Sequence, residues 1–232
     1  MKNFTVKEGL LEKFAPAEPF DFNFLYVDRH IPLEENINCF FKRTFDLVVS
    51  SLLIIFLFSW LFPVIALLIK LGSKGPVLFF QRRNKKNGKL FTCIKFRTMI
   101  VNDKADVLGA IENDFRITKL GWILRKHHLD ELPQLFNVIW GDMSLVGPRP
   151  YMVSDNDKYG KLIKDYMVRQ KIKPGITGMA QAINYVNPIN GIEYMEQRVK
   201  KDVFYVYNWS FLMDVKIVIR TFFKMAGLKK YG

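Results

Sequence analysis

The residues most suited to chemistry are an acidic pair, Asp130 and Glu131, that stands just ahead of Pro133. Because proline fits the first turn of a helix, we expect a helix over 133–140 with both carboxylates at or before its N-terminus. Ionised carboxylates there can bind a divalent cation or attack an electrophile. Arg149 follows between two prolines, and a guanidinium matches phosphate oxygens. The set suggests phosphate chemistry, although on the pair alone an acidic helix cap is the simpler interpretation.

Further basic residues could take part in the same chemistry. Two β-prone runs flank an Asn-Gly turn signal within 77–96, so we expect a β-hairpin there. Lys95 and Arg97 are two residues apart and would share one side of an extended strand. Arg116 and Arg125 are further candidate phosphate ligands. Taken alone, such charges are more often solvated than bound to a phosphate.

Other motifs give weaker indications. His127 and His128 are adjacent, without a third ligand at metal spacing, so we expect a structural or surface role for both. Pro174 and Gly175 predict a type II turn. The glycines at 175 and 178 could let the backbone approach a ligand closely, or could belong only to the turn. The sequence contains no P-loop, Rossmann fingerprint or catalytic Ser-His or Cys-His signature.

The composition and charge of the chain limit the classes of protein and of partner that fit it. The 232 residues carry a net charge of +13, and the charge is uneven: residues 1–41 hold 4 basic and 7 acidic residues, whereas 42–232 hold 31 and 15. A basic body predicts anionic partners, namely nucleic acid, an acidic membrane surface or phosphorylated substrates. Two cysteines are too few for a disulfide framework. The charged first residues do not fit a cleavable signal peptide.

The clearest physical signal is the uncharged run over 47–69. As one straight helix it would rise about 35 Å, enough to cross a bilayer core. Lys42 and Arg43 precede the run and Lys70 and Lys74 follow it, which favours the same membrane face for both ends. Ser59 and Pro63 lie in its second half, where proline kinks or breaks a helix. We favour a broken, re-entrant helix over a kinked spanning helix, and either over a buried core helix.

Two more helices are expected near the C-terminus. One covers 192–208, and the other covers 211–226, where Lys216, Arg220 and Lys224 recur every four residues on an otherwise apolar helix. This pattern is typical of a helix lying in a membrane interface with its cations toward lipid phosphates. An amphipathic core helix with a basic outer face fits it as well, but the apolar run favours the membrane interpretation.

Taken in order, these pieces resemble the bacterial sugar transferase family, the monotopic polyprenyl-phosphate phosphoglycosyl transferases that begin lipid-linked glycan assembly. The similarity runs from Lys42 to about Lys224. The matching segments are KRTFDL at 42–47, GPVLFFQRR at 75–83, KFRTM at 95–99, RITKLGWILRKHHLDELPQLFNV at 116–138, GDMSLVGPRP at 141–150, KPGITGMAQ at 173–181 and DVFYVYNWSFLMDVKIVIRT at 202–221.

The resemblance implies an α+β, mainly helical fold with a re-entrant membrane helix, interfacial amphipathic helices and a small β-hairpin. The expected parts are an N-terminal extension over 1–41, the re-entrant helix over 42–74, a catalytic domain over 75–226 and a tail over 227–232. The catalytic domain would face the cytoplasm at the bacterial inner membrane. The family breaks its membrane helix at an adjacent Ser-Pro pair, whereas three residues separate Ser59 and Pro63 here.

The resemblance also implies a mechanism. Asp130 would attack the β-phosphate of a UDP-sugar, UMP would leave, and undecaprenyl phosphate would then take the sugar phosphate from the aspartate. Mg²⁺ would be held by Asp130 and Glu131. The phosphates would be bound by Lys95, Arg97, Arg116, Arg125 and Arg149, and the nucleotide by Arg169. This is the first membrane step of exopolysaccharide, capsule, O-antigen or glycoconjugate synthesis.

Larger relatives carry four further membrane helices and a soluble module ahead of this core, so we expect a compact member or an excised catalytic unit. The ending with YNWS favours glucose or galactose over an N-acetylated sugar. A homo-oligomer is compatible with the sequence. A non-catalytic, basic membrane-surface scaffold is the main alternative, but it leaves the acidic pair unexplained. Nucleic-acid binding fits the charge but not the uncharged run.

Overall fold

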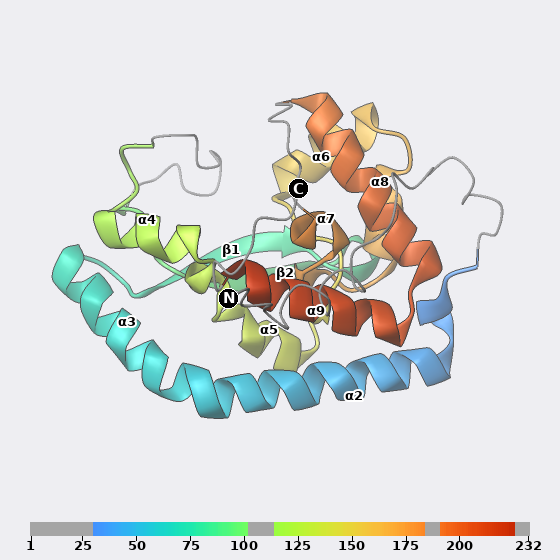
Figure 1. The fold of residues 1–232 in the computed structure, drawn as a ribbon. Helices are drawn as coiled ribbons and strands as arrows, with labels where there is room; N and C mark the ends of the chain where they lie inside the picture. The colour runs from blue at the N-terminus through green and yellow to red at the C-terminus, as the bar shows by residue number, and fades with distance from the viewer. Residues whose placement is uncertain (1–29, 102–113, 184–190, 226–232) are drawn as a thin grey trace, which may run out of the picture.

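The computed structural model describes residues 30–101, 114–183 and 191–225. It is mainly helical with two small sheets, which confirms the expected α+β class (Figure 1). The helices are α2 (Asn36–Leu53), α3 (Ser59–Gly72), α4 (Lys119–Lys126), α5 (Gln134–Trp140), α6 (Val153–Leu162), α7 (Met179–Ala182), α8 (Ile192–Asn208) and α9 (Phe211–Met225). The strands are β1 (Leu78–Asn84), β2 (Leu90–Phe96), β3 (Ser144–Val146) and β4 (Gly175–Thr177). Most of the expected extension over 1–41 and the tail over 227–232 lie outside the described residues.

The apolar run forms part of one long helical stretch, Asn36–Gly72, of 37 residues. Among the described residues this is the helix long and apolar enough to cross a membrane, and only 17% of its most apolar window is buried. A buried core helix is therefore excluded. The sequence predicted a break in the helix between Ser59 and Pro63, but the chain stays helical through both residues. Instead a π-helical turn, η3 (Ile54–Phe58), joins α2 to α3, and the chain bends there (Figure 1).

Helix α2 is amphipathic in the opposite sense to a helix of a water-soluble protein. Its buried stripe is polar and consists of Lys42, Asp46 and Ser50, spaced four residues apart. Its outer face carries Phe40 and Val48, which are 65% and 53% exposed. Apolar surface of this extent is stable only when something other than water covers it.

Two residues of the polar stripe of α2, Lys42 and Asp46, are paired with residues far away in the sequence. Lys42 Nζ lies 2.6 Å from Asp214 Oδ2 of α9, and both side chains are buried. Tyr205 OH and Trp209 Nε1 also donate to Asp214. Asp46 accepts hydrogen bonds from the Ser144 hydroxyl and the Leu145 amide at β3. These contacts fix α2 to both β3 and α9.

Removing one partner of this buried pair should be costly. Lys42→Met leaves the Asp214 carboxylate buried without its cation, so we expect the free energy of unfolding to fall by about 3–5 kcal/mol. Chemical denaturation in detergent measures the change. The double variant Lys42→Met/Asp214→Asn should recover part of the loss, because no unpaired charge remains. A single variant as stable as the parent chain would contradict this account.

The hairpin forms where the sequence predicts it. Strands β1 and β2 pair antiparallel from Leu78↔Phe96 to Asn84↔Leu90, and Asn87 and Gly88 adopt the positive φ angles of the turn. Helix α5 is attached to this hairpin through Asn137, whose amide nitrogen donates to Thr92 O and whose oxygen accepts from Ile94 N. These two hydrogen bonds therefore fix the position of α5, the helix that follows the acidic pair, relative to the hairpin.

The type II turn predicted at Pro174–Gly175 is wrong. Gly175 has no positive φ and begins β4, which runs parallel to β3 with Ser144↔Gly175 and Val146↔Thr177 in register. The glycines serve backbone packing: a Cβ on Gly175 would lie 2.1 Å from Gly147 N, and one on Gly178 would lie 2.1 Å from Gly147 O. This close pairing sets the position of the chain after β3, where Arg149 lies.

Both C-terminal helices are confirmed, α8 at the predicted bounds and α9 over Phe211–Met225, where the described residues end. Helix α9 packs against β3, β4 and α7 (Figure 1). Its Ile217 is buried, whereas Leu212 and Phe222 are 68% and 66% exposed. Lys224 Nζ donates to Gln181 O. One side of the helix therefore belongs to the core and the other is apolar and exposed, and its placement in a membrane interface stays a prediction.

Candidate functional site

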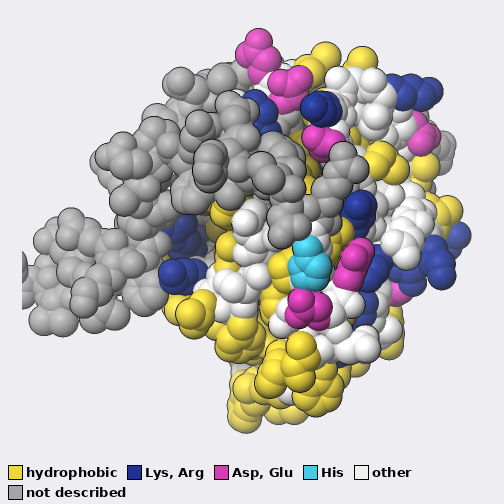
Figure 2. All heavy atoms as spheres, turned by 90° about the vertical axis from the view of Figure 1, so that its right-hand side faces the viewer, with side chains coloured by type: hydrophobic (Ala, Val, Ile, Leu, Met, Phe, Trp, Pro, Cys, Tyr) yellow, Lys and Arg dark blue, Asp and Glu magenta, His cyan; other side chains and the backbone are white. Residues whose placement is uncertain are grey.

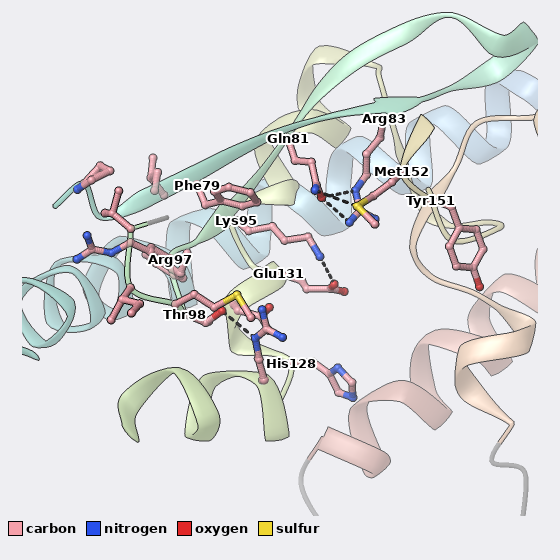
Figure 3. Close-up of a pocket in the computed structure, with 18 of the residues that line it drawn as sticks. Phe79, Gln81, Arg83, Lys95, Arg97, Thr98, His128, Glu131, Tyr151 and Met152 are labelled. Atoms are coloured by element: carbon pink, nitrogen blue, oxygen red, sulfur yellow. Dashed lines mark hydrogen bonds and ion pairs between the residues drawn. The ribbon is translucent and has the colours of Figure 1, made fainter. Parts of the chain in front are cut away.

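A cavity of about 630 Å³ lies between the hairpin, the acidic turn and the Pro-Arg-Pro segment (Figure 3). Strand β1 lines it with the alternate residues Phe79, Gln81 and Arg83, which share one face of the strand, and with Leu78 at the start of the strand. The polar and charged lining residues are Gln81, Arg83, Lys95, Arg97, Thr98, Arg125, His128, Asp130, Glu131, Arg149, Tyr151 and Asp155. The cavity thus gathers two adjacent carboxylates and five cationic side chains from segments far apart in the sequence.

Glu131 is the centre of an ion-pair network. Lys95 Nζ lies 2.5 Å from its Oε1, and the Arg149 guanidinium donates to Oε1 at 2.7 Å and to Oε2 at 3.1 Å. Although burial would raise the pKa of Glu131, the charges and hydrogen bonds of Arg149 and Lys95 hold it well below its ordinary value. Glu131 is therefore an ionised residue whose two oxygens are already used to orient two cations.

Asp130 is in the opposite situation. It belongs to the single turn η5 (Leu129–Glu131) just before α5, as predicted, and is 8% exposed. Its side chain makes no hydrogen bond or ion pair with any other described residue. Burial, and then the charge of Glu131, raise the pKa of Asp130 above its ordinary value, while Lys95 and Arg125 oppose the shift. An unpaired carboxylate at a cavity wall is available to a cation or an electrophile.

The raised pKa of Asp130 predicts a pH-dependent effect of Asp130→Asn on stability. The folded chain binds this proton more tightly than the unfolded chain, so ionising Asp130 costs stability as the pH rises from 3.8 through the raised pKa. In metal-free buffer the asparagine variant should equal the parent below this window and be more stable at pH 7. Unfolding curves across the pH range measure the difference. A variant that is less stable at pH 7 would contradict the prediction.

Two other arginines hold the turn that carries Arg149. Arg169 Nη2 donates to Arg149 O at 2.8 Å, and Arg83 Nη1 donates to Pro150 O. Arg169 is itself fixed by Asp202, whose Oδ2 lies 2.7 Å from its Nε, and by the ring of Tyr151, 4.6 Å away. The position of the Arg149 guanidinium is therefore determined from both sides of the turn.

The structure brings six of the eight predicted site residues into the cavity lining and leaves two outside it. Arg125 lines the cavity and donates from Nε to Thr98 Oγ1 at 2.8 Å. Arg97 also lines it, but its guanidinium donates to the carbonyls of Ser73 and Lys74 and so caps the end of α3. The two residues outside the lining are Arg116, paired with Asp114, and Arg169, paired with Asp202.

Several residues that line the cavity were not among the predicted site residues, and Arg83, Tyr151 and His128 are three of them. Arg83 could have been found, because it follows Phe79 and Gln81 at alternate positions of one strand. Tyr151 directly follows the Pro-Arg-Pro segment. The surface role expected for His128 is incomplete, because its side chain is exposed but also lines the cavity. It adopts a left-handed conformation, φ 55°, at the turn between α4 and η5, which no sequence signal predicts.

The carboxylates that line the cavity meet the requirements of a magnesium site only in part. Among the residues that the structure describes, no three His, Cys, Asp or Glu side chains gather as a ready-made metal site. Mg²⁺ commonly binds through one or two carboxylates and completes its shell with water and substrate phosphates. Asp130 meets this requirement because it is unpaired, whereas the oxygens of Glu131 are engaged by Lys95 and Arg149.

Comparison with known proteins gives a consistent result. The profile of a family described as bacterial sugar transferase matches residues 37–227. A UDP-glucose:undecaprenyl-phosphate glucose-1-phosphate transferase of Klebsiella pneumoniae is 49% identical over 189 residues, which are 81% of this chain and 40% of that protein. This chain therefore spans about two fifths of the length of that relative.

Two further relatives differ in length and in the sugar that they are named for. The exopolysaccharide production protein PSS of Rhizobium leguminosarum bv. phaseoli is 40% identical over 185 residues, 78% of this chain and 92% of that protein. An Aeromonas hydrophila protein is named for UDP-N-acetylgalactosamine and undecaprenyl phosphate. It is 39% identical over 191 residues, 82% of this chain and 44% of that protein.

Proposed function

The chain belongs to the bacterial sugar transferase family, and we propose that it transfers a sugar-1-phosphate from a UDP-sugar to undecaprenyl phosphate, releasing UMP. The observation that carries this proposal is the contrast between the two adjacent carboxylates. Asp130 is buried beside the cavity without a partner among the described residues, while Glu131 is neutralised by Lys95 and Arg149. One carboxylate is free to react, and the other holds the cations that would meet the substrate phosphates.

The chemistry follows in two displacements. A carboxylate oxygen of Asp130 attacks the β-phosphorus of the UDP-sugar, and the bond to UMP breaks with its electron pair leaving on the UMP oxygen. A phosphate oxygen of undecaprenyl phosphate then attacks the same phosphorus, and the aspartate leaves as a carboxylate. Neither step needs a proton at the reacting atoms. Arg149, Lys95 and Arg125 lie where they can stabilise charge on the phosphoryl oxygens.

Mg²⁺ would bind Asp130 together with the substrate phosphates. It would neutralise negative charge that builds up during phosphoryl transfer. The raised pKa of Asp130 is consistent with this role, because a carboxylate that is costly to ionise gains most from a nearby cation. Glu131 contributes through Lys95 and Arg149.

We further propose that the molecule sits on the cytoplasmic face of the bacterial inner membrane with α2 and α3 inserted. Figure 2 shows hydrophobic side chains gathered along the lower edge of the molecule, where α2 lies in Figure 1. The most exposed apolar residues of α2, α3 and the π-helical turn between them are Ile37, Phe40, Ile55, Phe56, Leu67 and Leu71. A hydrocarbon environment accounts for an apolar outer face above a polar buried stripe.

A re-entrant arrangement is supported by the bend at η3. Helix α2 packs on α5 and β3, and α3 packs on α4, so both arms contact the same catalytic domain. A straight continuation of α2 would carry α3 away from that domain. Ser59 Oγ donates to Ile55 O at 2.6 Å and so pairs a backbone carbonyl next to the bend, at a depth where water is scarce.

Cysteine labelling tests this topology. In a Cys39→Ser background, which removes the exposed native thiol, Glu35→Cys and Lys74→Cys place one thiol before and one after the helical stretch. Both should react with a membrane-impermeant maleimide from the same side of sealed vesicles. Labelling from opposite sides would mean that the helix spans the membrane. Cys93 is buried and serves as the internal control.

UMP release tests the enzymatic function. The detergent-solubilised protein is incubated with undecaprenyl phosphate, Mg²⁺ and a series of UDP-sugars, beginning with UDP-glucose because the Klebsiella relative is named for it. Release of UMP with one UDP-sugar supports the transferase and identifies the donor. A non-catalytic membrane scaffold would release no UMP with any of them.

A further inference from the structure

The cavity has two ends of different chemistry. At one end the lining is mostly apolar, with Pro76, Leu78, Phe79, Met99, Ile100 and Val101, and the guanidinium of Arg97 there is bound to the carbonyls of Ser73 and Lys74. At the other end it is polar, with Gln81, Arg83, Tyr151 and Asp155. Phe79 and Arg83 lie on the same face of β1, about 13 Å apart at the rise of an extended strand. Figure 3 shows them on opposite sides of the Lys95–Glu131 pair.

The apolar end adjoins the long hydrophobic helix. Arg97 binds the carbonyls of Ser73 and Lys74 at the end of α3, and a Cβ on Gly75 would lie 2.7 Å from a methyl group of Val101. Val101 and Ile100 are 65% and 45% exposed, and Leu71 near the end of α3 is 76% exposed. The cavity therefore opens at this end onto the same apolar surface that α3 presents.

We propose that this apolar end binds the first isoprene units of the polyprenyl phosphate acceptor, while the polar end binds the nucleotide of the donor. The proposal rests on the proposed function. It assigns the two ends of the cavity to the two substrates. When the acceptor phosphate reaches Asp130, its hydrocarbon chain must lie in a neighbouring part of the cavity. At the polar end the chain would strip water from Arg83 and Asp155, which is costly, whereas Phe79, Ile100 and Val101 gain from its contact.

The inference is tested by a pair of matched variants on β1. Phe79→Ser alters the cavity face of the strand, and Phe80→Ser alters the neighbouring residue, which is 54% exposed and outside the cavity lining. Two assays are applied in detergent. One is exchange of labelled UMP into UDP-sugar, which requires no acceptor. The other is steady-state transfer to undecaprenyl phosphate and to geranyl phosphate, whose short chain reports contacts near the phosphate.

Phe79→Ser should retain UMP exchange and the donor KM within about two-fold, and should raise the KM of both acceptors about ten-fold, as loss of a large apolar contact predicts. Phe80→Ser should change neither assay. Val101→Asp, at an exposed position where folding is not at risk, should raise the acceptor KM in the same way.

An unchanged acceptor KM in both Phe79→Ser and Val101→Asp would overturn the assignment, as would an equal loss in exchange and transfer. Absence of UMP exchange and of UMP release in the unmodified chain is a different result. It would overturn the proposed function itself, and the acceptor subsite with it.

Discussion

Asp130→Asn is expected to lower UMP release from a UDP-sugar by at least about 10³-fold, because an amide cannot displace UMP from phosphorus. The loss should appear both in turnover and in the acceptor-independent exchange of UMP, since the first displacement is affected. Mass spectrometry of the parent chain with UDP-sugar and no acceptor should detect a sugar phosphate attached to the peptide that contains Asp130. The variant should carry no such adduct.

The matched control is Asp142→Asn. Asp142 pairs with Lys85, and it is not part of the cavity lining. This variant should keep its activity within about two-fold, because the Lys85–Asp142 pair, whose side chains are 30% and 24% exposed, lies outside the cavity. Undiminished UMP release by Asp130→Asn would rule out Asp130 as the nucleophile and would require another group to displace UMP.

Arg149→Gln is expected to lower kcat/KM by about 10²–10³-fold, the usual effect of removing one preorganised charge from a site of this type. Arg149 makes two hydrogen bonds to Glu131 and is 29% exposed in its side chain, so it can face a substrate phosphate as well. Its loss leaves Glu131 with Lys95 as its remaining ion-pair partner. The pKa of Glu131 should rise, and the acid limb of the pH–rate profile should move to higher pH.

Arg149→Lys separates charge from geometry. Lysine keeps the positive charge but cannot form the two-pronged contact with Glu131, so we expect it to recover only part of the activity. Arg82→Gln is the control for net charge, because Arg82 is exposed on β1 and does not line the cavity. Equal losses in Arg82→Gln and Arg149→Gln would mean that net charge alone governs substrate binding.

Local signals in the sequence predict much of the fold. The hairpin follows from its Asn-Gly turn, α5 from Pro133, and α8 and α9 from periodicity. The type II turn at Pro174 was wrong because a parallel partner strand overrides a local turn preference. The π-helical turn before Ser59 was also missed, since a π turn has no local sequence signal of its own.

The sequence predicted most of the charged residues of the site, but not the contacts between them. Asp130, Glu131, Lys95 and Arg149 lie in one cavity, as their residue types suggested. Which cation meets which anion could not be read from spacing. Arg169 pairs with an aspartate 33 residues later on α8, and this contact depends on how that helix packs. Arg169 was predicted to bind the nucleotide, but it supports the turn that carries Arg149 and does not line the cavity.

The pairing of Lys42 with Asp214 joins positions 172 residues apart, and this separation has a consequence for biosynthesis. The hydrophobic helix is translated 172 residues before the carboxylate that pairs with its lysine. Until α9 has folded, Lys42 therefore lacks the ion pair that joins α2 to that helix. Copies that lack α9 should be degraded faster by membrane proteases than copies that contain it.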